Sequence, residues 1–575
     1  MRPIFKNALT WAIVATVGIP VVSGHSPAAA AAVVGNWHHT VRGEGSEELK
    51  DVVVNRQTND VYFIGTTTSK PDANSPVTLV SNGYNKTAFV SKISLSGTVQ
   101  WMKHIQDTTK DRRAEAIALG PDGSVYALTT EKLRQFSAPN HVRVTRYDAA
   151  GVQKWTRVLA SATGSEVGFD LDVNASTVAV AYSTTGQMGG ASRGLIDVVV
   201  TTLNSGTGAV VRTTQVGGSR NDFPSKIKFL SSGKILVAGS TNGKLFNVPT
   251  RSDLRTDHDF FWFVLNSDNS AVVNSMQWGT TSADRVSSLA VQTSGRFYVG
   301  GYSLGRTAKF TNRGEADALI SGFTADGVAD WTITFGTSDW DEITDLQPAP
   351  NSTDVLFFGT TFGVWNQASS GGVDMIGGSI RSTGEMFVRR QLGTSGDDYS
   401  TGMSLRSDSW PVLAGSTSGS FDGRTPRGYD GILISAGTTL ADFRDFQGAI
   451  TNLINNPPRF IPVFPVLGSE QAAGEQVPDV APDDRAESKQ AAPLCNEVAS
   501  ATVLYRRQVA TCAGLVIKQG TVTRIRLSLR NTAGVCSLSP RKRLKLTAPG
   551  TCKVKIRATQ SNGSTKAVWI NYTVS

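Results

Sequence analysis

The sequence lacks the features of several large protein classes. After the first thirty residues it has no long apolar run, and no hydrophobic tail ends it. No segment shows the 3.6-residue apolar period of an amphipathic helix, which argues against a helical bundle or a doubly wound α/β fold. Charged residues are only 18% of the chain, whereas glycine numbers 57. We therefore expect a soluble, turn-rich protein built from β-strands.

Residues for catalysis are also scarce. Beyond the N-terminus the only histidines are His38, His39, His104, His141 and His258, and they are scattered along the chain. A GxSxG pattern at 190–194 precedes a strand-like segment, whereas a nucleophile elbow lies between a strand and a helix. Neither an EF-hand loop nor a GGxGxDxUx repeat occurs. We predict no catalytic, cofactor-binding or metal-binding residue.

The first 32 residues are organised like an export signal. Arg2 and Lys6 precede an apolar stretch from Ala8 to Val22, and small residues follow at 28–32. The stretch is shorter than the roughly 20 residues of a membrane-spanning helix, and it contains Pro20. We therefore expect a secreted or envelope-associated protein; whether the signal is cleaved stays open.

Cysteine is absent until residue 495, and the four cysteines cluster near the C-terminus. An even number in an exported chain favours two disulfides, and the absence of CxxC argues against zinc. Three connectivities are open, of which we favour Cys495 with Cys512 and Cys536 with Cys552.

An internal repeat dominates the chain. A short motif in which glycine precedes aspartate by five residues, called here the GD motif, recurs every 58 or 59 residues. A degenerate copy spans Gly43 to Glu48, a copy ending at Asp111 lacks the glycine, and one near Gly164 is irregular. The clear copies end at Asp222, Asp284, Asp341 and Asp398.

Each period contains four strand-like segments after its GD motif. The second ends in small residues, as in Val412-Leu413-Ala414-Gly415, and a variable loop leads to a third that begins with Asp. The fourth commonly carries tryptophan. Those third-strand aspartates are Asp197, Asp259, Asp317, Asp374 and Asp430, and those fourth-strand tryptophans are Trp101, Trp155, Trp278 and Trp331.

Four short strands per period predict the blade of a β-propeller. Seven blades fit best, although six or eight remain open. The last copy lacks a fourth strand, whereas Gly35 to Val41, with Trp37, precedes the first GD motif as a strand without a blade. We predict that this strand completes the last blade beside Ile432 and closes a ring over residues 35–450.

The repeats resemble the bacterial secreted β-propeller repeat family known as SBBP. The resemblance covers Gly43 to about Ser435 and is carried by the GD-motif segment GTSGDDYS, the second strand VLAGSTSGSF and the third strand YDGILIS. It implies a propeller in an extracellular or envelope setting, and no particular reaction.

The repeated residues have structural explanations. The GD-motif aspartates Asp222, Asp284, Asp341 and Asp398 occur once per blade, as expected of carboxylates that accept backbone N–H bonds at a turn rather than of calcium ligands. We expect the tryptophans, Trp37 included, to pack between blades.

Residues 451–493 are rich in proline, alanine and acids and predict an extended linker. Residues 494–575 alternate like strands. The run Val535–Leu538 and the strand Gly550–Ile556, with its GTCxVxI pattern, resemble bacterial immunoglobulin-like modules. We expect a small β-sandwich whose disulfides supplement its core.

This C-terminal part is strongly basic. From Ala491 onward, fourteen Lys and Arg stand against one acid, Glu497. Such an excess predicts an anion-binding surface, and the absence of interleaved aromatics argues against nucleic acid. The candidate residues are Arg524, Arg526, Arg541, Lys542, Arg543, Lys545, Lys553, Lys555 and Arg557.

We expect a monomeric, non-enzymatic binding or scaffold protein without a cofactor. The variable loops, at 66–86, 184–194, 241–258 and 303–315, form one rim for a protein or glycan partner. The basic module associates with an anionic cell-wall polymer or glycan. The alternatives are a polysaccharide hydrolase or lyase with its site in the propeller channel, for which the sequence nominates no acids, and a structural surface-layer protein.

Overall fold

The computed structural model is built from β-strands. It describes residues 37–43, 45–68, 86–105, 107, 109–133, 138–246, 257–280, 282–305, 313–350, 352–365, 371–421, 423, 424, 426 and 428–435. In the C-terminal part it describes 497–498, 503–504, 522–529, 536–538, 544–546, 550–560 and 565–574. The predicted signal at 1–32 and linker at 451–493 lie outside these ranges. Within them no helix occurs, and none could therefore span a membrane.

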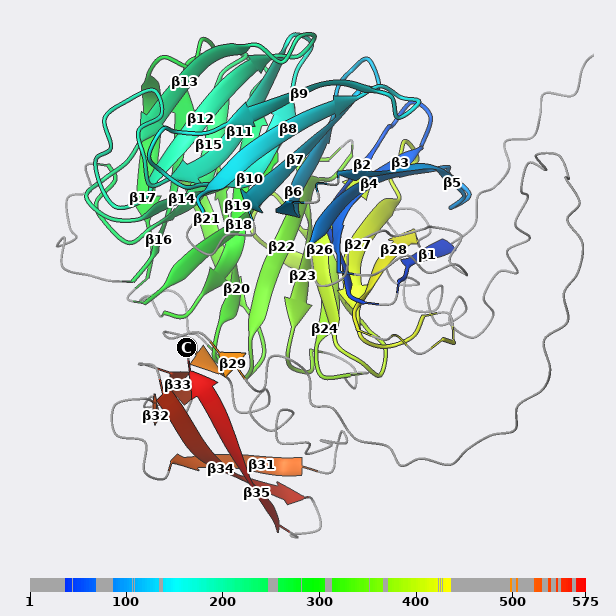
Figure 1. The fold of residues 1–575 in the computed structure, drawn as a ribbon, viewed down its shortest axis with the longest axis vertical. Coiled ribbons are helices and arrows are strands. Elements are labelled where there is room, and N and C mark those ends of the chain that lie inside the picture. Colours follow the sequence, from blue (N-terminus) through cyan, green and yellow to red (C-terminus); the bar gives the residue numbers. More distant parts are fainter. Residues whose placement is uncertain are drawn as a thin grey trace, which may run out of the picture.

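Seven four-stranded antiparallel sheets form the ring (Figure 1). The blades are numbered in chain order. Blade 1 comprises β2 (Glu47–Val54), β3 (Val61–Thr67), β4 (Thr87–Ile93) and β5 (Val99–Ile105). Blade 2 comprises β6 (Lys110–Leu119), β7 (Val125–Leu133), β8 (Asn140–Tyr147) and β9 (Gln153–Leu159). Blade 3 comprises β10 (Glu166–Val173), β11 (Thr177–Thr184), β12 (Asp197–Asn204) and β13 (Val210–Val216).

The remaining blades follow the same plan. Blade 4 comprises β14 (Asp222–Phe229), β15 (Ile235–Thr241), β16 (Asp259–Leu265) and β17 (Val272–Trp278). Blade 5 comprises β18 (Asp284–Val291), β19 (Phe297–Ser303), β20 (Asp317–Phe323) and β21 (Ala329–Phe335). Blade 6 comprises β22 (Asp341–Pro348), β23 (Val355–Thr361), β24 (Asp374–Ile380) and β25 (Met386–Leu392). Blade 7 comprises β26 (Asp398–Leu405), β27 (Pro411–Thr417), β28 (Asp430–Ser435) and β1 (Trp37–Val41).

Strand composition follows position within a blade. Second and third strands such as β15 and β16 are buried along their whole length, because neighbouring blades cover both faces of the sheet. Outer strands such as β13 begin with exposed residues. This explains why the second and third segments are nearly continuous apolar runs.

The innermost strand of every blade carries a one-residue bulge at the same place. In blade 4, for example, the register shifts between Pro224 and Lys226, and in blade 6 between Ile343 and Asp345. A bulge bends and twists the strand. The innermost strands of neighbouring blades are in contact all around the ring.

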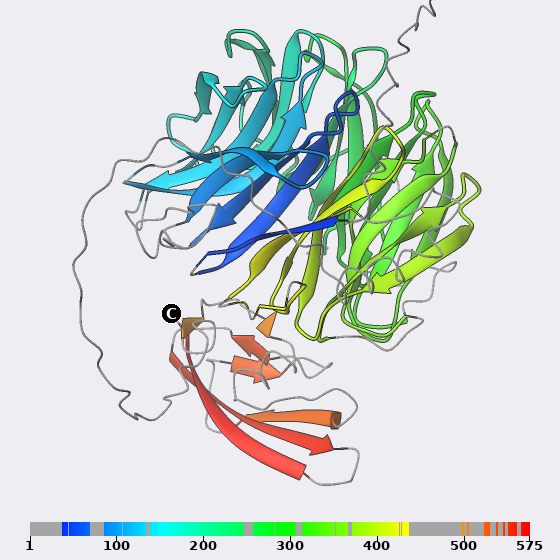
Figure 2. The ribbon, with the colours of Figure 1, turned by 90° about the vertical axis from the view of Figure 1, so that its right-hand side faces the viewer.

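The predicted ring closure is confirmed. β1 pairs antiparallel with β28, with Trp37 opposite Ser435 and Thr40 opposite Ile432. Figure 1 shows the blue β1 beside the yellow β28, and Figure 2 shows the blue and yellow blades adjoining. Trp37 is 3% exposed and belongs to a core that joins blades 7 and 1.

Tryptophans of outer strands bind the next blade. The indole Nε1 of Trp155 donates to Ser205 O at 3.0 Å, and that of Trp331 donates to Ser382 O at 2.7 Å. Below the Trp155 ring lies Gly208, with φ of +68°, where a Cβ atom would approach the ring to 2.7 Å. The turn therefore requires glycine for two reasons, its backbone angle and its contact with the indole.

Two further sheets lie in the C-terminal part. One has the order β29 (Glu497–Val498), β35 (Thr565–Val574), β34 (Gly550–Gln560) and β31 (Val522–Leu529). The other has the order β30 (Val503–Leu504), β33 (Leu544–Leu546) and β32 (Cys536–Leu538).

Candidate functional site

The GD-motif aspartates fix the turn before each innermost strand. Asp222 accepts the N–H of Gly218 at 2.7 Å, and Asp398 accepts the N–H and the hydroxyl of Thr394 at 2.6 and 2.9 Å. Asp284 and Asp341 make the same bonds with Thr280 and Thr337. All four aspartates are fully buried. We call the end of the ring where these turns lie the GD face.

Three GD-motif carboxylates, Asp222, Asp341 and Asp398, have an acidic neighbour from the preceding blade. Burial raises the pKa of Asp222 to about 6, and the charge of Asp197 contributes in the same direction. Asp398 beside Asp374 also has a pKa raised to about 6, by burial first and then by the neighbouring charge. Two buried carboxylates at one junction cannot both ionise without a cost.

Glutamines anchor the variable loops at their base. Gln215 Nε2 donates to Asp197 Oδ2 at 2.7 Å and to Gly186 O at 3.1 Å, while its Oε1 accepts the N–H of Met188 at 2.7 Å. Gln277 and Gln391 make equivalent bonds in blades 4 and 6. The loops therefore leave a common scaffold at fixed positions.

The degenerate GD motifs differ from their sequence assignment. The carboxylate in blade 1 is Glu47, which accepts the N–H of Gly43 at 2.6 Å, and not Glu48. In blade 3 the position is taken by Glu166, which accepts from Ser161 and Thr184. Both glutamates stand at the register position of Asp222, opposite a threonine of the second strand. Glu47 follows Gly43 by four residues and Glu166 follows Gly164 by two, so the five-residue glycine-to-acid spacing did not reveal them.

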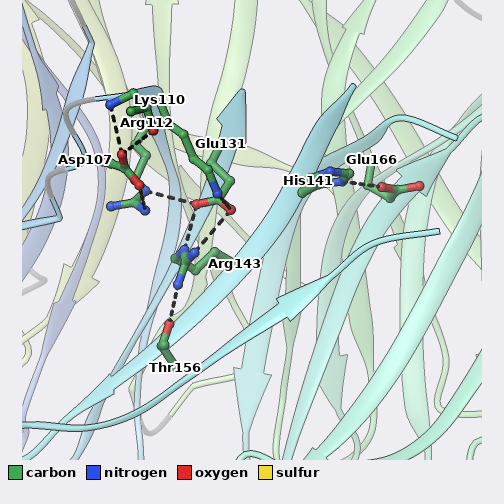
Figure 3. A network of polar contacts seen from close by, with 9 residues as sticks. Asp107, Lys110, Arg112, Glu131, His141, Arg143, Thr156 and Glu166 are labelled. Carbon is green, nitrogen blue, oxygen red and sulfur yellow. Dashed lines mark hydrogen bonds and ion pairs between the residues drawn. The ribbon is translucent and has the colours of Figure 1, made fainter. Parts of the chain in front are cut away.

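Blade 2 breaks the repeat. Arg112 occupies the position that the GD-motif aspartate holds in other blades. Glu131 occupies the position of the hydroxyl residue that ends the second strand, and His141 occupies that of the third-strand aspartate. Figure 3 shows Lys110, Arg112 and Arg143 around the Glu131 carboxylate. Their nitrogen atoms lie 2.8, 3.0 and 2.8 Å from its oxygens. Basic side chains stand at the two aspartate positions and an acid stands at the hydroxyl position, so the junction remains polar.

Glu131 is ionised at all moderate pH. Burial alone raises its pKa, but hydrogen bonds from Arg143 and Lys110 and the charge of Arg112 hold it at about 2. Its side chain is 1% exposed. The three cations are therefore matched to a buried anion, which fits a structural ion-pair network.

A surface cleft of about 530 Å³ opens beside this network, between blades 2 and 3. Its lining includes His141, Ser161, Gly164 and Thr185. His141 Nδ1 lies 3.2 Å from Glu166 Oε2 (Figure 3), and Ser161 donates to Glu166 Oε1 at 2.5 Å. The carboxylate is thus the central group, whereas a serine hydrolase needs histidine between serine and acid. The cleft therefore has no hydrolase triad.

Charged residues gather at the axis, where the sequence nominated no acids. Lys226 Nζ lies 3.9 Å from Asp170 Oδ1. Burial lowers the pKa of Lys226, but Asp170, Asp51 and Asp345 outweigh it and raise the pKa. Lys226 is therefore a protonated cation and not an amine nucleophile.

The axial acids bind neighbouring strands. Asp51 accepts the N–H of Ile117 at 3.0 Å, Asp170 that of Ile227 at 2.9 Å, and Asp345 that of Met403 at 2.7 Å. Each bond joins one blade to the next. The three acids occupy the same repeat position, directly after the bulge. Their hydrogen bonds connect neighbouring blades. In the described part of the chain no group of three or more His, Cys, Asp or Glu could hold a metal ion.

Partly exposed aromatic residues lie on the GD face of blades 3 to 7. Ring centres are 4.6 Å apart for Tyr302 and Trp340, and 5.9 Å for Tyr399 and Tyr429. They stand beside the GD motif or at the base of a loop, and they differ from blade to blade. We call this set the aromatic face: Phe169, Phe223, Tyr302, Trp340, Phe362, Tyr399 and Tyr429.

The sequence did not single out these aromatics. They stand near the GD motif and the third-strand aspartate, at repeat positions where the residue differs from blade to blade. That variability was their only signal, and a search for the pattern common to all repeats does not reveal it. Trp101, Trp155, Trp278 and Trp331 lie on outer strands and pack against aromatic rings, Trp101 against Tyr62 and Trp278 against Phe260.

Five of the nine basic candidates share one face of a C-terminal sheet. Arg526 lies directly opposite Arg557, and Lys555 opposite Ser528, while Arg524 and Lys553 lie two residues along the same strands. Val554, on the other face, is buried. Lys545 lies on β33, and Arg541, Lys542 and Arg543 lie outside the described residues.

The disulfide pairing stays a prediction. Cys495 and Cys512 lie outside the described residues, and the side chains of Cys536 and Cys552 are not described. Their strands, β32 and β34, belong to different sheets.

No protein-family model matches the chain, and a comparison with curated proteins finds no match. Among solved structures, the quinohemoprotein alcohol dehydrogenase of Comamonas testosteroni is 9% identical (TM-score 0.36; 70% of this chain, 76% of that chain). The extracellular domain of a hybrid two-component system of B. thetaiotaomicron is 11% identical (TM-score 0.36; 94% of this chain, 59% of that chain). An acylaminoacyl peptidase is 12% identical (TM-score 0.38; 71% of this chain, 54% of that chain). Likenesses this distant carry no argument about function.

Proposed function

We propose that this chain is an exported, non-enzymatic binding scaffold that docks a glycan or protein partner on its GD face. The aromatic face is the observation that carries the proposal. Its rings, such as Trp340 and Tyr399, are large and partly exposed, and they gather at one end of the propeller. Aromatic side chains are enriched where a protein binds a partner. The glutamine-anchored loops around them supply variable contacts.

The basic C-terminal sheet is the proposed anchor to the anionic cell envelope. Like charges directly opposite on neighbouring strands, as at Arg526 and Arg557, destabilise a sheet. A polyanion that binds this face relieves the repulsion. We further propose that the two C-terminal sheets form an immunoglobulin-like sandwich with a disulfide between Cys536 and Cys552, because their strands lie in different sheets.

Sedimentation of the full chain with isolated bacterial cell walls tests the anchor. Replacing Arg524, Arg526, Lys553, Lys555 and Arg557 by Gln is expected to remove most of the co-sedimentation, and molar salt is expected to release most of the wild type. The smaller part that remains is the contribution expected of the docking face. A matched control carries five Gln replacements at exposed propeller cations and should sediment like the wild type: Arg56, Lys154, Arg212, Lys234 and Arg381. Retention that molar salt does not reduce, or equal loss in both variants, contradicts the anchor.

The docking face is tested by paired tryptophan variants. Trp340→Ala alters the GD face, whereas Trp410→Ala alters an aromatic at the opposite end of the ring, in the turn between β26 and β27. With wall binding measured in molar salt or in the Gln variant, the residual binding should fall only for Trp340→Ala. Equal effects of the two variants would remove the support for the GD face.

A further inference from the structure

We infer that the junction of blades 4 and 5 on the GD face binds the carboxylate of an acidic sugar, with Arg285 as the anion-binding residue. This inference rests on the proposed docking role of the GD face and specifies its ligand. It follows from an arginine that has aromatic neighbours and, among the residues that the structure describes, no carboxylate partner.

Arg285 directly follows the GD-motif residue Asp284 and lies opposite Tyr302 on the neighbouring strand. Its guanidinium carbon is 5.7 Å from the centre of the Phe223 ring. Burial lowers its pKa, and the Tyr302 hydroxyl acts in the opposite direction. Within the described ranges no carboxylate forms an ion pair with Arg285.

The corresponding arginine of blade 2 behaves differently. Arg113 occupies the same repeat position, but its side chain is 51% exposed and its Nε lies 2.8 Å from Glu115 Oε1. A partly buried guanidinium without a carboxylate loses hydration that no ion pair replaces. Among the described residues Arg113 has a carboxylate partner and Arg285 has none, so Arg285 is the arginine that can pair with the carboxylate of a ligand.

His258 provides a second unsatisfied group at the same ring. Its ring centre lies 6.1 Å from that of Phe223, and its buried Nε2 has no hydrogen-bond partner in the described part of the chain. Burial, with a contribution from Arg285, lowers the pKa of His258 to about 4. The imidazole is thus neutral at pH 7 and can donate or accept a hydrogen bond without adding charge.

The surroundings favour a carboxylated sugar over a polyphosphate. A guanidinium matches the two oxygens of a carboxylate, and one arginine suits a single negative charge. The next blade carries Glu342 at the equivalent position, where its Oε2 accepts the Trp340 indole N–H at 3.1 Å. A carboxylate there disfavours densely charged anions but can accept sugar hydroxyls. Phe169, 6.4 Å from Phe223, and Tyr302 offer apolar ring faces.

Calorimetry of the full chain with trigalacturonate in about 0.15 M salt tests this site. The wild type should bind trigalacturonate, and its methyl ester should bind at least about 10-fold more weakly because it lacks the charge. Arg285→Gln should weaken trigalacturonate binding at least about 30-fold, Arg285→Lys less, and Arg113→Gln less than twofold. Unchanged melting of the variants shows that they fold.

Equal binding of the acid and the ester overturns the inference, as do equal effects of Arg285→Gln and Arg113→Gln. Preference for a glycerol phosphate oligomer over trigalacturonate also overturns it. If trigalacturonate does not bind while Trp340→Ala still reduces residual wall binding, the ligand assignment fails and the docking face stands. If Trp340→Ala also has no effect, both fail.

Discussion

Replacing Asp222 by asparagine is expected to stabilise the propeller at pH 7.5 and to destabilise it slightly at pH 4. Asp222 is fully buried, and burial together with the charge of Asp197 raises its pKa from 3.8 to about 6, against bonds from Gly218 and Thr241. One pKa unit corresponds to roughly 1.4 kcal/mol, so ionised Asp222 costs about 3 kcal/mol above pH 6.

The sign follows from proton uptake. Below pH 4 the carboxyl group is protonated in the folded and the unfolded chain, and the cost is absent. Between about pH 4 and pH 6 the folded protein binds more protons, so stability falls as pH rises. Asparagine has no charge to bury, but its amide accepts a weaker bond from Gly218 N–H, which costs about 1 kcal/mol. The net gain at pH 7.5 is about 2 kcal/mol.

Urea unfolding at pH 7.5 and pH 4 measures both values. Asp268→Asn in the same blade is the control, because Asp268 is exposed in a turn and should gain nothing at pH 7.5. If Asp222→Asn lowers stability equally at both pH values, the acid pair carries no repulsion and the reasoning is refuted.

Three further variants test the ring. Glu131→Gln should lower the free energy of unfolding in urea by about 3–4 kcal/mol, because it leaves buried cations without a matching anion. The stability that Glu131 contributes, with its pKa of about 2, is fully present above pH 4.5 and is lost as the pH falls toward 2. Trp331→Ala should lower the free energy of unfolding by about 2–3 kcal/mol in thermal or urea unfolding. Trp331→Phe, which keeps an aromatic ring but loses the bond to Ser382, should lower it by about 1 kcal/mol. Trp37→Ala should lower the free energy of unfolding by about 3–5 kcal/mol and speed proteolysis at the paired terminal strands β1 and β28, as seen on gels.

The controls use equivalent chemistry in exposed settings. Glu385→Gln removes an ion pair whose two side chains are more than half exposed, and it should change stability by less than about 0.5 kcal/mol. A similar loss for Glu131→Gln and Glu385→Gln would contradict the buried network. Intact, protease-resistant Trp37→Ala protein would show that the closing strand is not needed for the ring.

Much of the fold was predictable because one blade cannot bury its two faces alone. The fully apolar second and third strands require neighbours, and the unpaired strand carrying Trp37 had to complete the last blade. The degenerate copies of the GD motif were harder to assign from the sequence. Glu47 and Glu166 follow their glycines by four and two residues instead of five, and blade 2 has no GD-motif acid to find, because Arg112 stands in its place.

The candidate site was the least predictable part. Phe223, His258 and Arg285 are dozens of residues apart in the chain and stand at positions that the repeat leaves free. Their meeting depends on the contact between blades 4 and 5, which no local pattern encodes. The axial acids Asp51 and Asp345 converge for the same reason.

The sequence by itself determined the repeat, the strand order within each blade and the terminal closure, because local alternation and a fixed period constrain which segments can pair. Only the tertiary structure decided which unlike residues of different blades become neighbours. Burial, pKa and charge matching depend on those neighbours, since electrostatic energies are set by distance and surrounding protein rather than by position in the chain.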